Sequence, residues 1–191
     1  FYEFFVGPVT EIYCTAFASD PADEGWSHGG SIGSSDDWAW GSPTNSVDSG
    51  DPAAAYSPTH VFGMDLTGAT YEPDSTNFAM SPEIDVSGYE NVRLQYRRWL
   101  NVEDGFFDKA TIYVNGESTW TNFNSDQGNS SSTHHADREW RFQDVDLTPY
   151  VQDGKVQIKW ELASDPGLEL GGWTLDDVCV VALGASRESC G

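Results

Sequence analysis

The stretch Val156-Gln157-Ile158-Lys159-Trp160-Glu161-Leu162 alternates apolar and polar side chains without interruption. Successive side chains of a β-strand point to opposite faces, so this pattern predicts a strand with one buried and one exposed face. Residues 92–99 follow the same alternation until their last two positions, and residues 110–114 lead into Asn115-Gly116, the strongest two-residue hairpin signal. These segments predict an antiparallel sheet.

Further strands are predicted at 117–123, where the hairpin returns, and at 140–147 and 173–183. No segment keeps a 3.6-residue apolar period, so we expect little helix. Residues 19–60 are rich in Ser, Gly, Asp and Pro but also contain tryptophans, which are scarce in disordered segments, so we expect long loops held by these rings. The sequence therefore predicts an all-β protein, an antiparallel β-sandwich with long loops.

The overall charge of the chain is strongly negative, −22 over 191 residues, a length that suits one domain. An anionic surface repels phosphate backbones and argues against nucleic acid as a partner, whereas it is compatible with a hard cation such as Ca²⁺. No apolar run approaches the roughly 20 residues that span a bilayer, so we expect no membrane insertion. Because the chain begins at Phe1 without a basic and apolar leader, we expect a processed or excised piece, whose signal peptide, if it has one, lies elsewhere.

The three cysteines, Cys14, Cys179 and Cys190, lack the C-x-x-C spacing of zinc ribbons and thioredoxin-type sites. Cys14 and Cys179 flank most of the chain, and the terminal strands of a sandwich often lie side by side. We therefore expect a Cys14–Cys179 disulfide, with Cys14–Cys190 as the alternative. In the chain-entropy model, closing so long a loop stabilises the fold by about 4–5 kcal/mol.

The motifs that resemble catalytic sites lack the surroundings that their chemistry needs. The G-x-S-x-G pattern at 29–33 has no buried strand before it and no helix after it, unlike that of a serine hydrolase. His134, His135 and Asp137 offer metal ligands within one loop, but without the spacing of a zinc hydrolase. Adjacent acids such as Glu103-Asp104 identify no glycosidase pair, because such carboxylates meet across a cleft. We expect no enzyme, and a glycan-active hydrolase using a carboxylate pair stays an alternative.

The pair Asp176-Asp177 interrupts the apolar strand predicted at 173–183. Neighbouring side chains in a strand point to opposite faces, so one of these acids faces inward unless the strand bulges there. A buried carboxylate is costly unless it is paired or binds a cation. We therefore expect one of the two to serve a cation or a hydrogen-bond network, with Ca²⁺ as the candidate ion.

Several motifs together resemble the MAM-like jelly-roll domains that accompany secreted bacterial proteases, including immune-inhibitor-A-type proteases and zinc-carboxypeptidase precursors. GGWTLDDV at 171–178 is similar to the closing strand of these domains, and WAWGSP at 38–43 and VFGMDLTG at 61–68 resemble further motifs of the family. MSPEIDVS at 80–87 and the stretch 97–116 continue the resemblance in the same order.

The resemblance implies a non-catalytic jelly-roll β-sandwich over residues 14–183. Residues 1–13 would then be a linker or the last strand of a preceding domain, and residues 184–191 a C-terminal tail. The expected function is that of an accessory or interaction domain of a secreted multidomain protein, attached to a protease and serving attachment, targeting or stabilisation. Its partners would be neighbouring domains of the same precursor and a cell-surface glycan or protein.

The resemblance also implies a structural cation near the terminal strands, held by Asp177 or Asp176, with Asp65 as a second ligand. The family carries two acids after its first strand, and this chain has Ala16 and Ala18 there. The Ca²⁺ site is therefore weakened, lost or moved to the acids that follow, which are Asp20, Asp23 and Glu24.

Two further functions stay open from the sequence. Carbohydrate binding is one, because Trp26, Trp38, Trp40 and Trp120 lie in or near loops where sugars can stack on them, although tryptophan more often fills a core. A structural or assembly unit is the other, in which the apolar segment 1–13 joins a neighbour by adding a strand.

Overall fold

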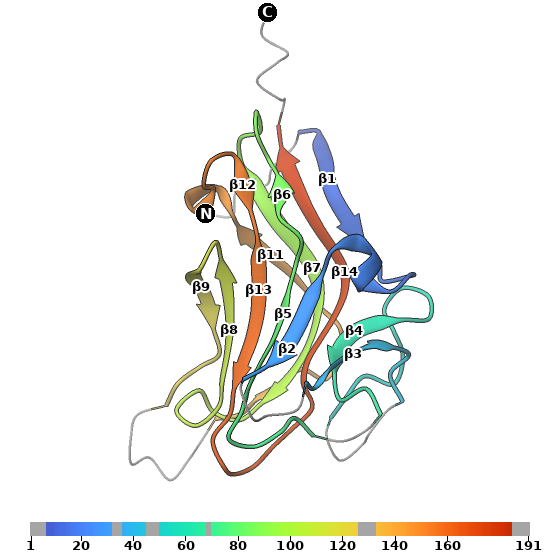
Figure 1. Cartoon of the computed structure of the whole chain (residues 1–191), viewed down its shortest axis with the longest axis vertical. Helices are drawn as coiled ribbons and strands as arrows, with labels where there is room; N and C mark the ends of the chain where they lie inside the picture. The colour runs from blue at the N-terminus through green and yellow to red at the C-terminus, as the bar shows by residue number, and fades with distance from the viewer. Residues whose placement is uncertain (1–6, 32–35, 45–49, 68–69, 126–132, 185–191) are drawn as a thin grey trace, which may run out of the picture.

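The chain forms a β-sandwich of two facing sheets (Figure 1). The computed structural model describes residues 7–31, 36–44, 50–67, 70–125 and 133–184. Its strands are β1 (Val9–Thr15), β2 (Ser27–Gly30), β3 (Trp38–Gly41), β4 (Val61–Met64), β5 (Thr76–Met80), β6 (Ile84–Asp85), β7 (Val92–Val102), β8 (Lys109–Val114), β9 (Glu117–Thr121), β10 (His135–Ala136), β11 (Arg141–Asp146), β12 (Lys155–Val156), β13 (Ile158–Ala163) and β14 (Gly172–Leu183). Two 3₁₀ helices, η1 (Pro21–Glu24) and η2 (Thr148–Tyr150), complete the elements of this described part.

The first sheet has seven strands, with β10, β7, β14, β4 and β3 side by side in that order. β1 also pairs with β14, and β11 also pairs with β7. Every pairing in this sheet is antiparallel, as predicted. The two longest strands, β7 and β14, are therefore neighbours at the centre of this sheet.

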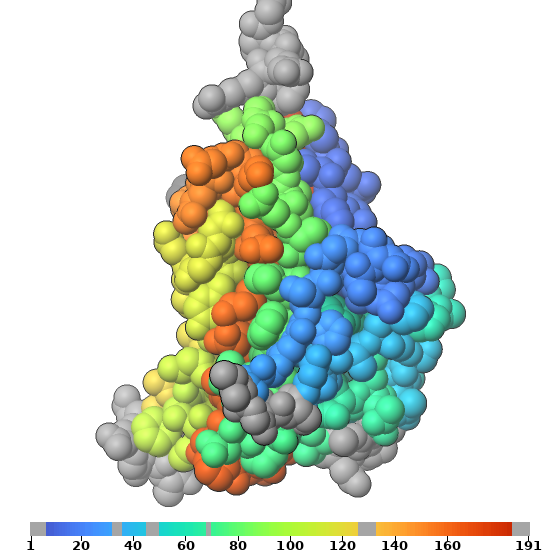
Figure 2. Space-filling model, viewed as in Figure 1, coloured from blue at the N-terminus to red at the C-terminus, as the bar shows by residue number. Residues whose placement is uncertain are grey.

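The second sheet has five strands in the order β2-β5-β13-β8-β9, and its pairings are also antiparallel. Its strands make the near face in Figure 2, where blue, green, orange and yellow segments lie side by side. In β13, buried and half-buried residues alternate strictly from Ile158 onward, which confirms the predicted strand for residues 158–162. Val156 instead belongs to β12, so the strand predicted from 156 is interrupted at Gln157. A two-stranded pair, β12 with β6, lies outside both sheets.

The hairpin predicted at Asn115-Gly116 joins β8 to β9. Both residues have positive φ angles, 49° and 83°, as a two-residue turn that follows the twist of its strands requires. The returning strand ends at Thr121, two residues before the predicted end.

Aromatic rings fill the space between the two sheets. Trp26 stacks on Trp160 with ring centroids 5.6 Å apart, and Tyr96 of the first sheet meets Trp160 of the second edge-on at the same distance. Trp38 contacts Phe62 at 5.1 Å. The predicted long loops of residues 19–60 are therefore held by rings that reach the core.

The N-terminal boundary of the domain lies earlier in the chain than residue 14. Val9–Thr15 form β1, and Val9 to Tyr13 pair with β14 in the first sheet, from Val9 opposite Leu183 onward. These residues are therefore part of the sandwich, which corrects the expected linker at 1–13 for residues 9–13. Residues 1–6 and residues 185–191, which include Cys190, lie outside the described residues.

Candidate functional site

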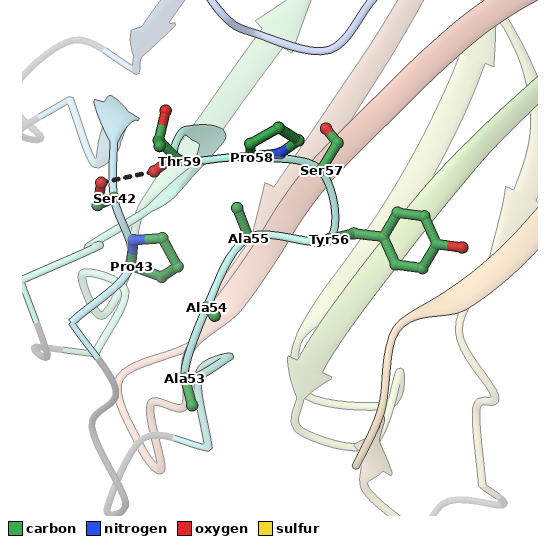
Figure 3. Close-up of a pocket in the computed structure, with 9 residues that line it drawn as sticks. All are labelled: Ser42, Pro43, Ala53, Ala54, Ala55, Tyr56, Ser57, Pro58 and Thr59. Atoms are coloured by element: carbon green, nitrogen blue, oxygen red, sulfur yellow. Dashed lines mark hydrogen bonds between the residues drawn. The ribbon is translucent and has the colours of Figure 1, made fainter.

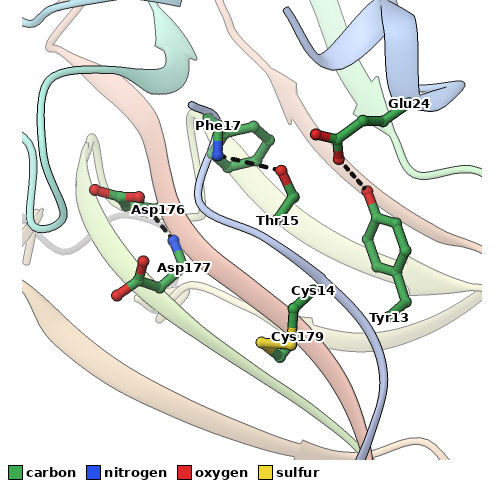
Figure 4. The surroundings of a disulfide bond; sticks show 8 residues. All are labelled: Tyr13, Cys14, Thr15, Phe17, Glu24, Asp176, Asp177 and Cys179. Carbon is green, nitrogen blue, oxygen red and sulfur yellow. Dashed lines mark hydrogen bonds between the residues drawn. A yellow bond between two sulfur atoms is a disulfide. The ribbon is translucent and has the colours of Figure 1, made fainter. Parts of the chain in front are cut away.

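A β-bulge lies in β14 at the acidic pair, between Asp176 and Cys179. Asp177 has a φ of 46°, a left-handed conformation that Asp tolerates better than most residues. The bulge keeps Asp177 half-buried, while Asp176 is fully buried and accepts a hydrogen bond from the Asp177 backbone N–H at 2.8 Å (Figure 4). The sequence predicted either an inward-facing acid or a bulge in the strand, and the structure has both.

The Asp176 carboxylate is saturated by donors from the loop before β4. One oxygen accepts the backbone N–H groups of Tyr56 and Ser57, each at 2.9 Å, and the other accepts the Ser57 hydroxyl at 2.9 Å. Burial raises the pKa of Asp176, and the bonds from Ser57 oppose that shift. Of the two expected roles, the structure gives Asp176 the hydrogen-bond network, because these contacts anchor residues 56–57 to the sheet.

The disulfide joins Cys14 to Cys179, as expected, across two strands that lie directly opposite each other (Figure 4). It fastens β1 to β14 beside the bulge and closes 165 residues of chain. The pairing of the first strand with the last, which the sandwich predicts, is what brings these two residues together.

The other acids of the predicted cation set are used locally. Asp20 caps η1 by accepting the Ala22 N–H at 3.0 Å, and Glu24 accepts the Tyr13 hydroxyl at 3.0 Å (Figure 4). Asp65 is half-buried, and its pKa is raised to about 6 by burial and then by nearby carboxylates, led by Asp37.

These predicted ligands are not gathered around one point. Among the described residues, the acids whose ligand atoms converge form a different group, and it includes none of Asp20, Glu24, Asp65, Asp176 and Asp177. Ala16 and Ala18 lie exposed on either side of buried Phe17 and supply no ligand oxygen from their side chains. The expected set of cation ligands is therefore corrected.

The tryptophans predicted to stack on sugars are mostly used in packing. Trp26 and Trp38 are 5% and 3% exposed, so neither presents a ring face to solvent. Trp40 is half-buried, donates to the Phe17 carbonyl at 2.7 Å and stacks on His60. Trp120 is half-buried against the edge of Trp173. This burial corrects the predicted sugar platform.

The segment 134–137, which the sequence places in a loop, contains strand β10 and forms an ion-pair site. Asp137 is buried and accepts two hydrogen bonds from the Arg98 guanidinium, at 2.9 and 3.2 Å, and one from the Leu100 N–H. His135 lies 3.2 Å from the same carboxylate. Since the bonds to His135 and Arg98 outweigh the effect of burial, the pKa of Asp137 is lowered.

An exposed group of rings lies on the outer face of the first sheet. We call it the aromatic patch and define it as Tyr56, Arg97, Trp140 and Phe142. The Arg97 guanidinium lies 4.0 Å from the Tyr56 ring centre and 5.1 Å from that of Phe142. Tyr56 and Phe142 are 47% and 52% exposed, although both are large and apolar. Phe142 was not selected from the sequence. The signal that could have found it is an aromatic residue at an outward-facing position of a predicted strand.

A cavity of about 550 Å³ opens between the loop 53–59 and Ser42-Pro43 (Figure 3). Alanine, proline and hydroxyl-bearing side chains line it, and the Ser42 hydroxyl donates to the Thr59 carbonyl at 2.5 Å across one end. Its lining contains no carboxylate, histidine, lysine or arginine. The convergent acid pair that a glycan hydrolase requires is therefore not found in this cavity.

Three carboxylates do converge elsewhere. We call Glu103, Asp108 and Asp165 the acidic cluster, whose ligand atoms all lie within 4.8 Å of one another. Glu103 follows β7, Asp108 precedes β8, and Asp165 lies in the connection from β13 to β14. Such a cluster could hold a metal ion. The adjacent pair Glu103-Asp104 was visible in the sequence, but its partners come from distant positions that no spacing reveals.

Comparison with known proteins gives one relative by sequence and a fold by structure. No family model matches the chain. Bacillopeptidase F of Bacillus subtilis (strain 168) is 30% identical over 181 residues, which cover 94% of this chain but 11% of that protein. The K1 cleaved adhesin domain of Lys-gingipain from Porphyromonas gingivalis W83 aligns with a TM-score of 0.53 and 14% identity, over 93% of this chain and 100% of that domain.

The K3 cleaved adhesin domain of the same gingipain aligns with a TM-score of 0.51 and 14% identity, over 91% of this chain and 99% of that domain. At such identity the two solved structures support the sandwich fold alone. The described residues contain no helix long and apolar enough to cross a membrane.

Proposed function

We propose that the chain is a non-catalytic accessory domain of a secreted protein that contains a protease, and that it attaches the neighbouring catalytic domain to a cell-surface target. The match to Bacillopeptidase F carries this proposal, because it takes in 94% of this chain and only 11% of that protein. A segment that aligns almost from end to end within a much longer protein behaves as a separate domain unit.

The MAM-like jelly roll remains the proposed family, with the sandwich extended to residues 9–183 and residues 184–191 as a tail. Disulfides persist mainly in oxidising compartments, so the Cys14–Cys179 bond supports an extracellular location. Ca²⁺ belongs to the proposal as a structural cofactor rather than a catalytic one.

The aromatic patch is the proposed binding surface. Tyr, Trp and Arg are the residues most enriched at the energetic centres of interfaces, and the patch combines all three with Phe142. Arg97 is held between two rings, so little side-chain freedom is lost when a partner covers it.

Carbohydrate is the second candidate target for the same surface. Tyr56 and Phe142 are exposed rings on either side of a guanidinium that can donate hydrogen bonds to hydroxyl groups. This arrangement gives the sugar-binding hypothesis a location that the buried tryptophans do not. Competition of binding by soluble polysaccharides would separate a glycan target from a protein target.

Removing the domain from its parent protein tests the accessory role. Deletion of residues 9–183 should leave kcat/KM for a short peptide substrate within about twofold of the intact protein, because the chemistry lies in another domain. The same deletion should move the protease from the cell fraction to the medium. A loss of kcat/KM in a deletion variant whose catalytic domain is still folded would contradict the proposal.

A further inference from the structure

The acidic cluster brings together three segments that are distant in the sequence. Glu103 and Asp108 bracket the connection from β7 to β8, and Asp165 comes from the connection between β13 and β14. Glu103 and Asp108 are 7% and 0% exposed, and Asp165 is half-buried. Three carboxylates thus meet at one end of the sandwich with little solvent to screen them.

Two members of the cluster have hydrogen-bond donors and the third lacks one. Asp108 accepts from the Tyr71 hydroxyl and, at 2.7 Å, from the Asp165 N–H, while Asp165 accepts from the Gly167 N–H at 2.8 Å. One carboxylate oxygen of Glu103, Oε2, is buried and has no hydrogen-bond partner among the described residues. A buried carboxylate oxygen without a donor is costly, so this atom is available to bind a ligand from outside the protein.

In the part of the chain that the structure describes, no basic side chain pairs with the cluster. None of the ion pairs among the described residues involves its three members. Negative charge is therefore concentrated here without a counter-ion.

We propose that the acidic cluster is a structural Ca²⁺ site. Its donors are all carboxylate oxygens, which suit hard cations, whereas structural zinc sites are built from Cys and His. Ligands at about 2.3–2.6 Å from Ca²⁺ lie up to about 5 Å apart across the ion, and the three ligand atoms fall within that span. The inference deepens the proposed function, since an extracellular domain meets enough Ca²⁺ to fill such a site.

The surrounding backbone is already fixed in place. The Asn122 amide donates to the carbonyls of Glu103 and Asp108, at 2.9 and 3.0 Å, and so ties both ends of the loop to the residue after β9. Gly105 packs so tightly that a Cβ there would lie 2.8 Å from the Phe123 carbonyl oxygen. The loop is thus held before any ion binds, which lowers the ordering cost of binding. The ion would then join this loop to the β13–β14 connection.

The experiment is calorimetric titration of the EDTA-stripped 191-residue chain with CaCl₂, MgCl₂ and ZnCl₂, together with thermal unfolding in each. We expect Ca²⁺ to bind with a dissociation constant at or below about 10⁻³ M and to raise Tm, with a weaker effect of Mg²⁺. Glu103→Gln should weaken Ca²⁺ binding at least about tenfold and reduce the Ca²⁺-dependent rise in Tm.

Thermal unfolding of Glu103→Gln in EDTA shows whether weaker Ca²⁺ binding comes from the lost ligand atom or from a destabilised fold. Because this variant removes a buried charge from among like charges, its Tm in EDTA should equal or exceed that of the wild type. Asp65→Asn, a half-buried acid outside the cluster, should retain Ca²⁺ binding. The proposal is overturned if a few millimolar Ca²⁺ gives neither heat nor a rise in Tm, or if Glu103→Gln binds Ca²⁺ as the wild type does. Since the isolated chain is used, either result would leave the proposed attachment role untouched.

Discussion

At the scale of single residues, the two neighbouring acids of β14 do different things because of one backbone angle. The positive φ of Asp177 lets the strand bulge, and the bulge leaves Asp176 beneath the loop before β4. A fully buried carboxylate would destabilise the fold on its own, but four donors from Tyr56, Ser57 and Asp177 satisfy it. The sequence could predict that an acid here needs a partner, and it could not predict which loop would supply the donors.

Asp176→Asn should lower the free energy of unfolding by about 3 kcal/mol, because an amide nitrogen would face backbone N–H donors that now have no acceptor. Asp177→Asn is the matched control. Asn tolerates a positive φ, and the Asp177 carboxylate is half-buried beside an open groove, so the change should stay within about 0.5 kcal/mol. Urea denaturation of both variants measures the difference. An Asp177→Asn variant that loses as much stability as Asp176→Asn would contradict this assignment of roles.

At the scale of elements, the alternation of apolar and polar residues predicted the strands, but it did not predict how the loops are arranged. Side-chain period fixed β7 and β13, and a two-residue turn signal fixed the β8–β9 hairpin. The acidic cluster and the aromatic patch combine residues from connections far apart in the chain, and their meeting depends on which strands become neighbours. Periodicity along one segment contains no information about that order, so it cannot predict which acids and which rings come together.

The Cys14–Cys179 disulfide, which joins β1 to β14, should contribute strongly to the free energy of unfolding. It closes 165 residues, for which the chain-entropy model gives about 5 kcal/mol. The double variant Cys14→Ser/Cys179→Ser should therefore unfold at a much lower urea concentration. Dithiothreitol should shift the wild-type midpoint toward that of the variant and leave the variant unchanged. Equal midpoints for the wild type and the double variant would show that pairing of the strands alone holds β1.

At the scale of the whole molecule, the residues that stabilise the sandwich differ from those of the proposed binding surface. Its interior is filled by aromatic and aliphatic side chains, and the cavity beside the loop 53–59 lacks acid and base groups. The aromatic patch lies outside this core, on the outer face of the first sheet. A net charge of −22 surrounds this patch, in which Arg97 is a positive centre. The proposed attachment role uses this outer surface.

The most direct test of attachment is the retention of a fluorescent protein fused to this chain on washed cells of the source organism. The fusion should stay with the cells while the fluorescent protein alone washes away. Replacing both exposed rings, in Tyr56→Ala/Phe142→Ala, should weaken retention about tenfold or more, as expected for aromatic centres of an interface. Phe123→Ala, which removes a 62%-exposed ring outside the patch, should have no effect. If the wild-type fusion washes off as readily as the fluorescent protein alone, the chain is not an attachment domain.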